Sequence, residues 1–524
     1  MTLPPQSIPS RTWNLAAGLI LFAVTVLALA QWPAYPYFLD SAYHLAVIRG
    51  FREAGGPVLH AFWEAAPEGH PHLYPPLFHL LWAPASTLNI PPMVMARLWS
   101  FAAFPLLLLA AWIVLSRVFT ARTACLTLIA LATPYSFFLA AVNYLPATLV
   151  LAATLGILLA LHEKRWLAGG LLLALSFWTH ASFPWLITLA LILFGWFEPS
   201  FRKTAWAIVC VGIAGGSPWI FHLLRHFSEL HLHPRGEERF FETSPFLLAL
   251  GLIGLKLAWS RGGLYRFLVA LAVGFLPMLA GWRFRYFSSQ GLFAWLLLSG
   301  IALEWLVEKI RRPWLRLKEV PRGFPSVTAP LVISESWAIG LLLGGLLLGA
   351  PGVHWSTSDH PLGHRGLHWA WADTTFAMLA GRPAVIPRAT AQPVFRERFL
   401  KELVETVQAR TNPNDLITSN YDYVALMLGA RTGRAVTNLG SQDPVAPARL
   451  VVWVKDPSGQ PSENLKEIAS KYSLRFIQET EIALVYQNPK AQGQKKIRPA
   501  AVPGWVGFGL IGLAFGAVVW DFRR

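Results

Sequence analysis

Apolar residues form long runs without polar breaks along most of the chain. A helix needs roughly 20 consecutive apolar residues to cross the hydrocarbon core of a bilayer. Runs that reach or approach this length occupy residues 12–31, 96–116, 121–140, 145–161, 166–180, 183–197, 204–222, 245–259, 264–282, 287–307, 331–350 and 501–520. The pattern predicts an α-helical polytopic membrane protein with about twelve transmembrane helices, although the shortest runs are marginal for the thickness of a bilayer.

A further apolar run, over residues 74–89, differs from the others because it contains Pro75, Pro76 and Pro84. Proline lacks a backbone N–H group, and its ring clashes with the preceding helical turn. A continuous spanning helix is therefore disfavoured in this run. We expect it to lie in the membrane interface.

If run 74–89 does not span, every second loop between the predicted helices is basic. The basic positions are Arg117/Arg122, Lys164/Arg165, Arg202/Lys203, Arg261/Arg266, the 309–322 cluster and the terminal Arg523/Arg524. The positive-inside rule predicts that these loops and both termini lie on the cytoplasmic side of the cell (plasma) membrane. Residues 32–95, 223–244 and 351–500 then lie outside. The first run ends in small residues, 28–30, that resemble a signal-peptidase site, but its length favours an uncleaved anchor.

Residues 351–500 lose the apolar runs and show short alternating elements. The pattern predicts helices at 396–410, 423–428 and 463–472, and strands at 416–419, 435–437, 450–454, 474–478 and 482–486. Strands separated by helices indicate a small α/β layer. The chain is therefore divided into a transmembrane module over 1–350, an extracytoplasmic α/β domain over 351–500, and a final helix with a basic cytoplasmic tail over 501–524.

Composition supports the membrane prediction. The chain is 54% hydrophobic and only 14% charged, whereas a soluble globular protein has about a quarter charged residues. The net charge is +16, but the basic residues lie in short clusters between apolar runs and form no long polar face. Membrane lipids are therefore the expected partner, and nucleic acid is not.

The predicted outer loop 32–95 carries the best candidates for chemistry. Asp40, Tyr43 and His44 follow a few residues after the first run, and Glu64 and His70 come later in the loop. A carboxylate and an imidazole at the membrane surface can meet a lipid-linked substrate. The alternative is that an acidic, histidine-containing loop is simply solvated.

These residues resemble motifs of a known superfamily. Residues 40–44 (Asp-Ser-Ala-Tyr-His) and 74–78 (Tyr-Pro-Pro-Leu-Phe) resemble the D-x-x-Y-H and Y-P-P motifs of GT-C glycosyltransferases, especially oligosaccharyltransferase catalytic subunits. Residues 283–287 (Arg-Phe-Arg-Tyr-Phe) are similar to an R-F-x-x-Y element of those enzymes. Residues 420–424 (Asn-Tyr-Asp-Tyr-Val) resemble their W-W-D-Y-G stretch. The matches occur in the same order as in the family.

The resemblance implies an inverting transfer of a sugar from a polyprenyl-phosphate-linked donor to an acceptor on the outer face of the membrane. Asp40 would be the general base, and Arg283 and Arg285 would bind the donor phosphate. The acceptor stays open among protein, lipid and glycan. Further candidates for binding the sugar or the acceptor are Tyr43, His44, Glu64, His70, Tyr74, Asn143, Tyr421, Asp422 and Tyr423.

Two departures from the family pattern limit these implications. Oligosaccharyltransferases carry two acidic metal ligands in the second outer loop, where this chain has Asn143 and no carboxylate. A Mg²⁺ or Mn²⁺ site is therefore left undetermined, because hard cations prefer charged oxygen ligands. Asn420 and Tyr421 stand where the family has paired tryptophans that read the sequon, so recognition of a protein sequon is not supported.

Two non-catalytic alternatives remain. A transporter or flippase of lipid-linked glycans is disfavoured because the sequence shows no related halves and its polar residues gather outside the predicted spans. A GT-C-like scaffold without activity is compatible with the missing second carboxylate.

Overall fold

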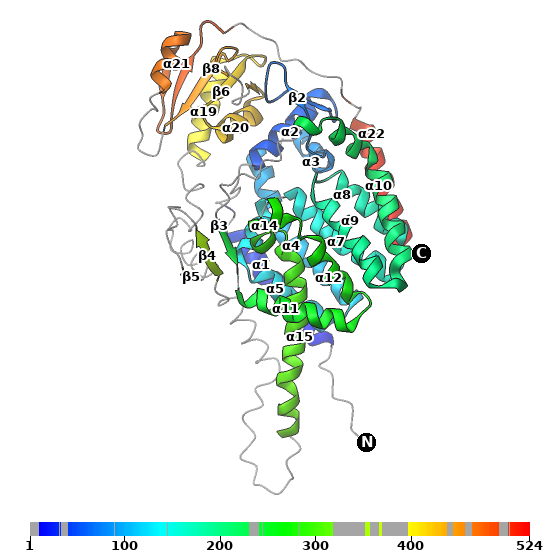
Figure 1. Ribbon diagram of the computed structural model, residues 1–524. Helices are drawn as coiled ribbons and strands as arrows, with labels where there is room; N and C mark the ends of the chain where they lie inside the picture. Colours follow the sequence, from blue (N-terminus) through cyan, green and yellow to red (C-terminus); the bar gives the residue numbers. More distant parts are fainter. Residues whose placement is uncertain are drawn as a thin grey trace.

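The computed structural model describes residues 10–30, 32, 40–88, 90–143, 145–229, 240–243, 245–281, 283–317, 352–356, 366–368, 397–437, 444–455, 464–491, 501 and 504–523. Three structural parts are visible in Figure 1: a helical bundle, a five-stranded sheet with flanking helices, and a three-stranded sheet. The five-stranded sheet lies at one end of the bundle (Figure 1).

The helices of the bundle follow the predicted apolar runs. They are α1 (Ser10–Ala30), α4 (Pro92–Val118), α5 (Ala121–Ala132), α6 (Tyr135–Asn143), α7 (Leu145–His162), α8 (Trp166–Phe177), α9 (Phe183–Phe197), α10 (Arg202–Arg225), α11 (Pro245–Arg261), α12 (Tyr265–Gly274), α13 (Met278–Gly281), α15 (Leu292–Leu317) and α22 (Gly504–Arg523). Every predicted run contains a helix except 331–350, which lies outside the described residues.

In the part of the chain that the structure describes, five helices are long and apolar enough to cross a membrane: α1, α4, α7, α10 and α15. The pair α5 and α6 would be a sixth span, but it is bent by 85°. Helices α8 and α9, residues 265–281 and residues 511–522 are apolar but shorter than the roughly 20 residues that an upright span requires. The number of crossings therefore stays a prediction.

Helix α1 shows how the bundle divides its apolar surface between protein and lipid. Its buried residues recur at helical spacing and form one stripe in the main core: Trp13, Ala17, Ile20, Val24 and Ala28. Large apolar residues such as Leu15, Leu19 and Phe22 are exposed on the remaining surface. Exposed leucine and phenylalanine side chains of this density suit contact with lipid tails. Helix α1 therefore packs into the bundle through its buried stripe and leaves the rest of its surface for lipid.

Polar contacts connect three helices at one end of the bundle. Glu304 on α15 accepts hydrogen bonds from Thr123 on α5, at 2.8 Å, and from Arg261 on α11, at 2.7 Å. One turn further along α15, Glu308 lies 3.0 Å from Arg122. Two of the predicted basic loops therefore meet at the same end, as the alternation of loops requires.

Before α4, the chain forms α2 (Asp40–Ala54), the short strands β1 (His60–Ala61) and β2 (His70–Pro71), and α3 (Leu77–Thr87). Helix α3 has 11 residues and contains Pro84, so it is too short for a span, as expected for this run. Gly50 lets the loop approach α2, because a Cβ atom there would overlap the Trp63 ring. We call residues 40–76 the α2 segment.

The five-stranded sheet contains β6 (Leu416–Ser419), β7 (Ala435–Val436), β8 (Leu450–Val454), β9 (Arg475–Glu479) and β10 (Ala483–Gln487) in the order β7-β6-β8-β10-β9. Strands β7, β6 and β8 are parallel, and β10 is antiparallel to both of its neighbours. Ile417 and Val452 pack against α19 (Glu397–Arg410) and α20 (Asp422–Thr432), whereas Val451 and Trp453 pack against α21 (Asn464–Tyr472). Helices therefore cover both faces of this sheet, and we call residues 397–487 the α/β domain.

The α2 segment and the α/β domain are in direct contact. Strand β7 extends onto the segment, since Val436 N–H donates to Trp63 O and Ala66 N–H donates to Val436 O, both at 2.9 Å. Arg49 on α2 donates to Ala430 O on α20 at 2.9 Å. Residues of both parts share one apolar core. The α/β domain is thus held against the segment that begins at Asp40.

The three-stranded sheet joins segments distant in sequence. Strands β3 (Phe240–Thr243), β4 (Gly352–Ser356) and β5 (Gly366–His368) pair antiparallel in that order. Residues 353–356 therefore pair with the segment before α11, although they were expected to belong to the α/β domain.

Candidate active site

The candidate site is built around the first turn of α2. Asp40 is the first residue of that helix and is half-buried. A carboxylate is favoured at a helix N-terminus because the unpaired N–H groups carry partial positive charge. The side chains of Tyr43 and His44 follow on the next turn. The helix itself therefore groups three of the predicted site residues.

Tyr74, from the loop before α3, completes an aromatic cluster with these residues. Its ring centroid lies 5.8 Å from that of Tyr43 and 5.2 Å from that of His44. Burial raises the pKa of Tyr43 well above its ordinary value, and the charges of Glu64 and Asp40 raise it further. The charges of Asp40 and Glu64 therefore both act on the Tyr43 phenol. Tyr74 contacts the same ring.

Arg285 supplies positive charge to this cluster from α14 (Arg283–Ser288). Burial and then Asp40 raise the pKa of Tyr74, and the charge of Arg285 acts on it in the opposite direction. The charges of the Arg285 guanidinium and the Asp40 carboxylate therefore act on one tyrosine from different elements. The side chain of Arg283 lies outside the described part of the chain.

The loop between β1 and β2 carries the second acidic residue. Glu64 Oε1 lies 3.2 Å from Nε2 of His70, whose side chain is 40% exposed. Burial lowers the pKa of His70, but contact with Glu64 and the charge of that carboxylate outweigh burial, so the net pKa is raised. His70 beside Glu64 is therefore protonated more readily than an isolated histidine.

Four histidines lie near the tyrosines, and His44, His72 and His79 are buried, whereas His180 is half-buried. Nδ1 of His44 is 3.0 Å from Nε2 of His79, and the His79 ring also contacts His72. His180, between α8 and α9, lies 6.2 Å from Tyr74 by ring centroids. Burial lowers the pKa of His44 and His72 to about 3, and that of His79 also falls. These imidazoles are therefore neutral near pH 7.

His79 and His180 were missed in the sequence analysis. His79 directly follows the motif at 74–78, which was the available signal. His180 ends the apolar run 166–180 beside Thr179, where a polar pair at a predicted helix end is the only local clue. Neither position reveals by itself that the two imidazoles lie near Tyr74 and His44.

The structure describes the remaining predicted site residues only in part. Asn143 ends α6, and its buried Oδ1 has no hydrogen-bond partner among the described residues. Tyr421 precedes α20 and packs against the core shared with α2. Asp422 and Tyr423 begin α20, but their side chains lie outside the described part of the chain. The roles of these residues at the sugar or acceptor stay predictions.

The described side chains do not form a metal-binding cluster. Within the described ranges, no three or more histidine, cysteine, aspartate or glutamate side chains are arranged to hold a metal ion. Mg²⁺ and Mn²⁺ are usually held by carboxylate oxygens. The described side chains therefore do not fit such a site.

The arrangement contains the groups that a transfer reaction needs. Asp40 can accept a proton, Arg285 can pair with a phosphate through its planar guanidinium, and neutral imidazoles can donate or accept hydrogen bonds. The rings of Tyr43 and Tyr74, with centroids 5.8 Å apart, lie in the same cluster.

Comparison with solved structures shows which known folds this chain resembles. ArnT from Cupriavidus metallidurans in the apo state matches 91% of this chain and 98% of its own, with a TM-score of 0.56 and 12% sequence identity. The apo oligosaccharyltransferase from Archaeoglobus fulgidus matches 84% of this chain and 69% of its own, with a TM-score of 0.54 and 11% identity. No family model and no curated protein sequence matches the chain.

A third match is to the archaeal oligosaccharyltransferase AglB from Archaeoglobus fulgidus in complex with an inhibitory peptide and a dolichol-phosphate. It covers 90% of this chain and 74% of its own, with a TM-score of 0.53 and 12% identity. ArnT and AglB are GT-C glycosyltransferases. The chain therefore has the GT-C fold, in agreement with the sequence motifs, although its sequence is highly divergent.

Proposed function

We propose that this protein is an inverting glycosyltransferase that moves a sugar from a polyprenyl-phosphate-linked donor to an acceptor. The observation that carries the proposal is the cluster that Tyr43, His44 and Tyr74 form at the first turn of α2, which begins with Asp40. The charges of Asp40 and Arg285 both act on Tyr74. A proton acceptor and a phosphate-binding cation are the two groups that this reaction requires. The shared GT-C fold and the dolichol-phosphate bound to AglB support this class of donor.

The reaction follows from these roles. The acceptor hydroxyl gives its proton to the Asp40 carboxylate while its oxygen forms a bond to the anomeric carbon. The bond from that carbon to the phosphate oxygen breaks, and its electron pair goes to the phosphate. Attack opposite the leaving group inverts the configuration. Arg285 pairs with the departing phosphate, whose negative charge increases as the bond breaks.

The neutral histidines have a positioning role in this proposal. His44 contacts both tyrosines and His79, so it holds the first turn of α2 against the loop that carries Tyr74. A charged imidazole here would compete with Arg285 for the donor phosphate. Burial, which keeps these rings neutral, leaves Arg285 as the main positive charge acting on Tyr74.

We further propose that the site faces the outside of the cell membrane and that both termini are cytoplasmic. The alternating basic loops support this orientation, and Arg122 and Arg261 from two of them meet on α15. In intact cells, a membrane-impermeant thiol reagent should label Glu405→Cys in the α/β domain and spare Lys164→Cys between α7 and α8. Both positions are exposed. The reverse labelling pattern would contradict this orientation.

The proposed donor can be sought directly on the purified protein. Native mass spectrometry of protein extracted in mild detergent should show bound adducts with the mass of a polyprenyl-phospho-sugar. Arg285→Ala should reduce this adduct, whereas Arg475→Ala, on the exposed strand β9, should not. Adducts containing only ordinary phospholipids in all three proteins would argue against the proposed donor.

A further inference from the structure

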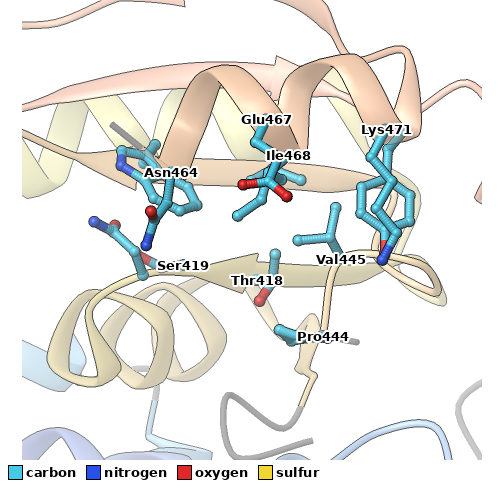
Figure 2. A pocket seen from close by; sticks show the side chains of 12 residues that line it. Thr418, Ser419, Pro444, Val445, Asn464, Glu467, Ile468 and Lys471 are labelled. Atoms are coloured by element: carbon cyan, nitrogen blue, oxygen red, sulfur yellow. The ribbon is translucent and has the colours of Figure 1, made fainter. Parts of the chain in front are cut away.

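The α/β domain contains a pocket away from the candidate active site. It has a volume of about 390 Å³ and lies between β6, β8 and α21 (Figure 2). Helix α21 covers the sheet face opposite α19 and α20, and α20 is the helix that contacts α2. The pocket is therefore on the far side of the sheet from the α2 segment.

The position of the pocket follows from the order of the strands. The chain passes from β6 to β7 on one side of β6 and then to β8 on its other side. This reversal is a topological switch point, where open α/β sheets bind ligands at the carboxyl ends of their strands. Thr418, Ser419 and Asn420 lie at the carboxyl end of β6 and line the pocket.

Thr418 provides the pocket with a polar group whose hydrogen-bonding capacity is unused by the described residues. Its side chain is only 3% exposed, and its Oγ1 has no hydrogen-bond partner among the described residues. A buried hydroxyl without a partner destabilises a fold and is rare. Figure 2 shows Thr418 on the strand side of the pocket and the Glu467 carboxylate extending toward it from α21.

The lining also defines the chemistry of the ligand. Glu467 and Lys471 contribute one charge of each sign, so the pocket favours neither an anion nor a cation. Hydroxyl and amide groups lie beside an apolar and aromatic surface that includes Trp453 and Tyr472. Sugars match this combination, because they present hydroxyl groups at their edges and C–H groups on their faces. The volume also lies within the range of small-molecule sites.

A peptide fits the pocket less well. Peptides often bind by adding a strand to the free edge of a sheet. Strands β6 and β8, which form the floor, are paired with each other, and the β7 edge is occupied by residues 63–66. Asn420 also connects the two floor strands through hydrogen bonds of 3.0 and 2.7 Å with Val454. Recognition here therefore depends on side chains.

We propose that this pocket is a carbohydrate-binding site, and that it holds the glycan part of the acceptor. The role in holding an acceptor rests on the transferase function proposed above. Sugar binding in the pocket does not depend on that function, so sugar binding and glycosyl transfer can fail separately.

Saturation-transfer NMR on the full-length protein in lipid nanodiscs, without donor, tests the site. The probes are glucose, galactose and N-acetylglucosamine, and an uncharged serine-containing tripeptide is the comparison. At least one sugar should receive saturation. Thr418→Val and Glu467→Gln should each reduce that signal at least fivefold. Glu405→Gln, an exposed glutamate on the opposite face, is the matched control.

The melting temperature separates binding from folding. Thr418→Val removes a buried hydroxyl that has no hydrogen-bond partner among the described residues, so it should leave the melting temperature unchanged or raise it while weakening sugar binding. A lower melting temperature would show that the hydroxyl is structural and would overturn the proposal. Saturation of the tripeptide alone, of no probe, or of sugars equally in all variants would also overturn it.

Discussion

Asp40→Asn is expected to stop glycosyl transfer while leaving the fold and donor binding nearly intact. The substitution keeps the size and hydrogen-bonding capacity of the side chain but removes the proton acceptor. Loss of a general base typically lowers a rate by about 10²- to 10⁴-fold. Because Asp40 is half-buried at the start of α2 and lies outside the apolar core, its replacement by a neutral isostere should not unfold the helix. The rate at saturating donor is the quantity to measure.

Glu68→Gln is a matched control for this experiment. Glu68 belongs to the same α2 segment and is exposed, and its backbone carbonyl, which is retained in the variant, contacts His60. The rate of glycosyl transfer by Glu68→Gln should equal that of the wild type. Equal loss of rate in both variants would show that acidic charge in the segment matters in general, and Asp40 would lose its assigned role.

Arg285→Ala is expected to weaken donor binding as well as turnover. A contact with the donor phosphate exists in the ground state and strengthens in the transition state, so its loss raises KM and lowers kcat. A hydrogen bond to a charged group contributes about 1.5–3 kcal/mol, which corresponds to a change of roughly 10- to 100-fold. Steady-state kinetics with a synthetic short-chain polyprenyl-phospho-sugar measures both constants.

Arg285→Lys should recover part of the donor binding, because lysine keeps the charge but loses the planar pair of donors. Arg475→Ala serves as the control for removal of a surface arginine. If Arg285→Ala lowers kcat and leaves KM unchanged, the guanidinium contacts the substrate only in the transition state. If neither constant changes, Arg285 does not contact the donor phosphate.

The two variants also separate the functional classes. In a transporter of lipid-linked glycans, Asp40→Asn has no chemical step to affect, although Arg285→Ala would still weaken lipid binding. In an inactive scaffold neither variant changes a rate, because no transfer occurs. Selective loss of transfer in Asp40→Asn is specific to an enzyme.

Local sequence patterns predicted most elements of the fold. Hydrophobic periodicity depends only on neighbouring residues, so the strands and helices expected in 396–486 agree with β6 to β10 and α19 to α21 within about two residues, apart from the C-terminal end of α20. The sharp bend between α5 and α6 was not expected within run 121–140, although Pro134 lies at the break. Proline prevents the helix from continuing there.

Features of the fold that depend on tertiary packing could not be predicted from local sequence patterns. The pairing of β3 with β4 joins residues separated by more than a hundred positions, and neither segment shows a strand pattern strong enough to identify its partner. At the site, Asp40, Tyr43, His44 and Tyr74 were found from local motifs. The approach of His79 and His180 to that cluster is fixed by how α3 and the α8–α9 connection pack, which no motif encodes.

The central claim is that a lipid-linked sugar is transferred with Asp40 as the base. Its most direct test follows release of polyprenyl phosphate from a synthetic donor by wild-type protein and Asp40→Asn in nanodiscs, with and without a crude acceptor fraction. The proposal predicts acceptor-dependent release by the wild type and a rate at least about 10²-fold lower in the variant. Equal release by the two proteins, or no release by the wild type with any acceptor fraction, would contradict it.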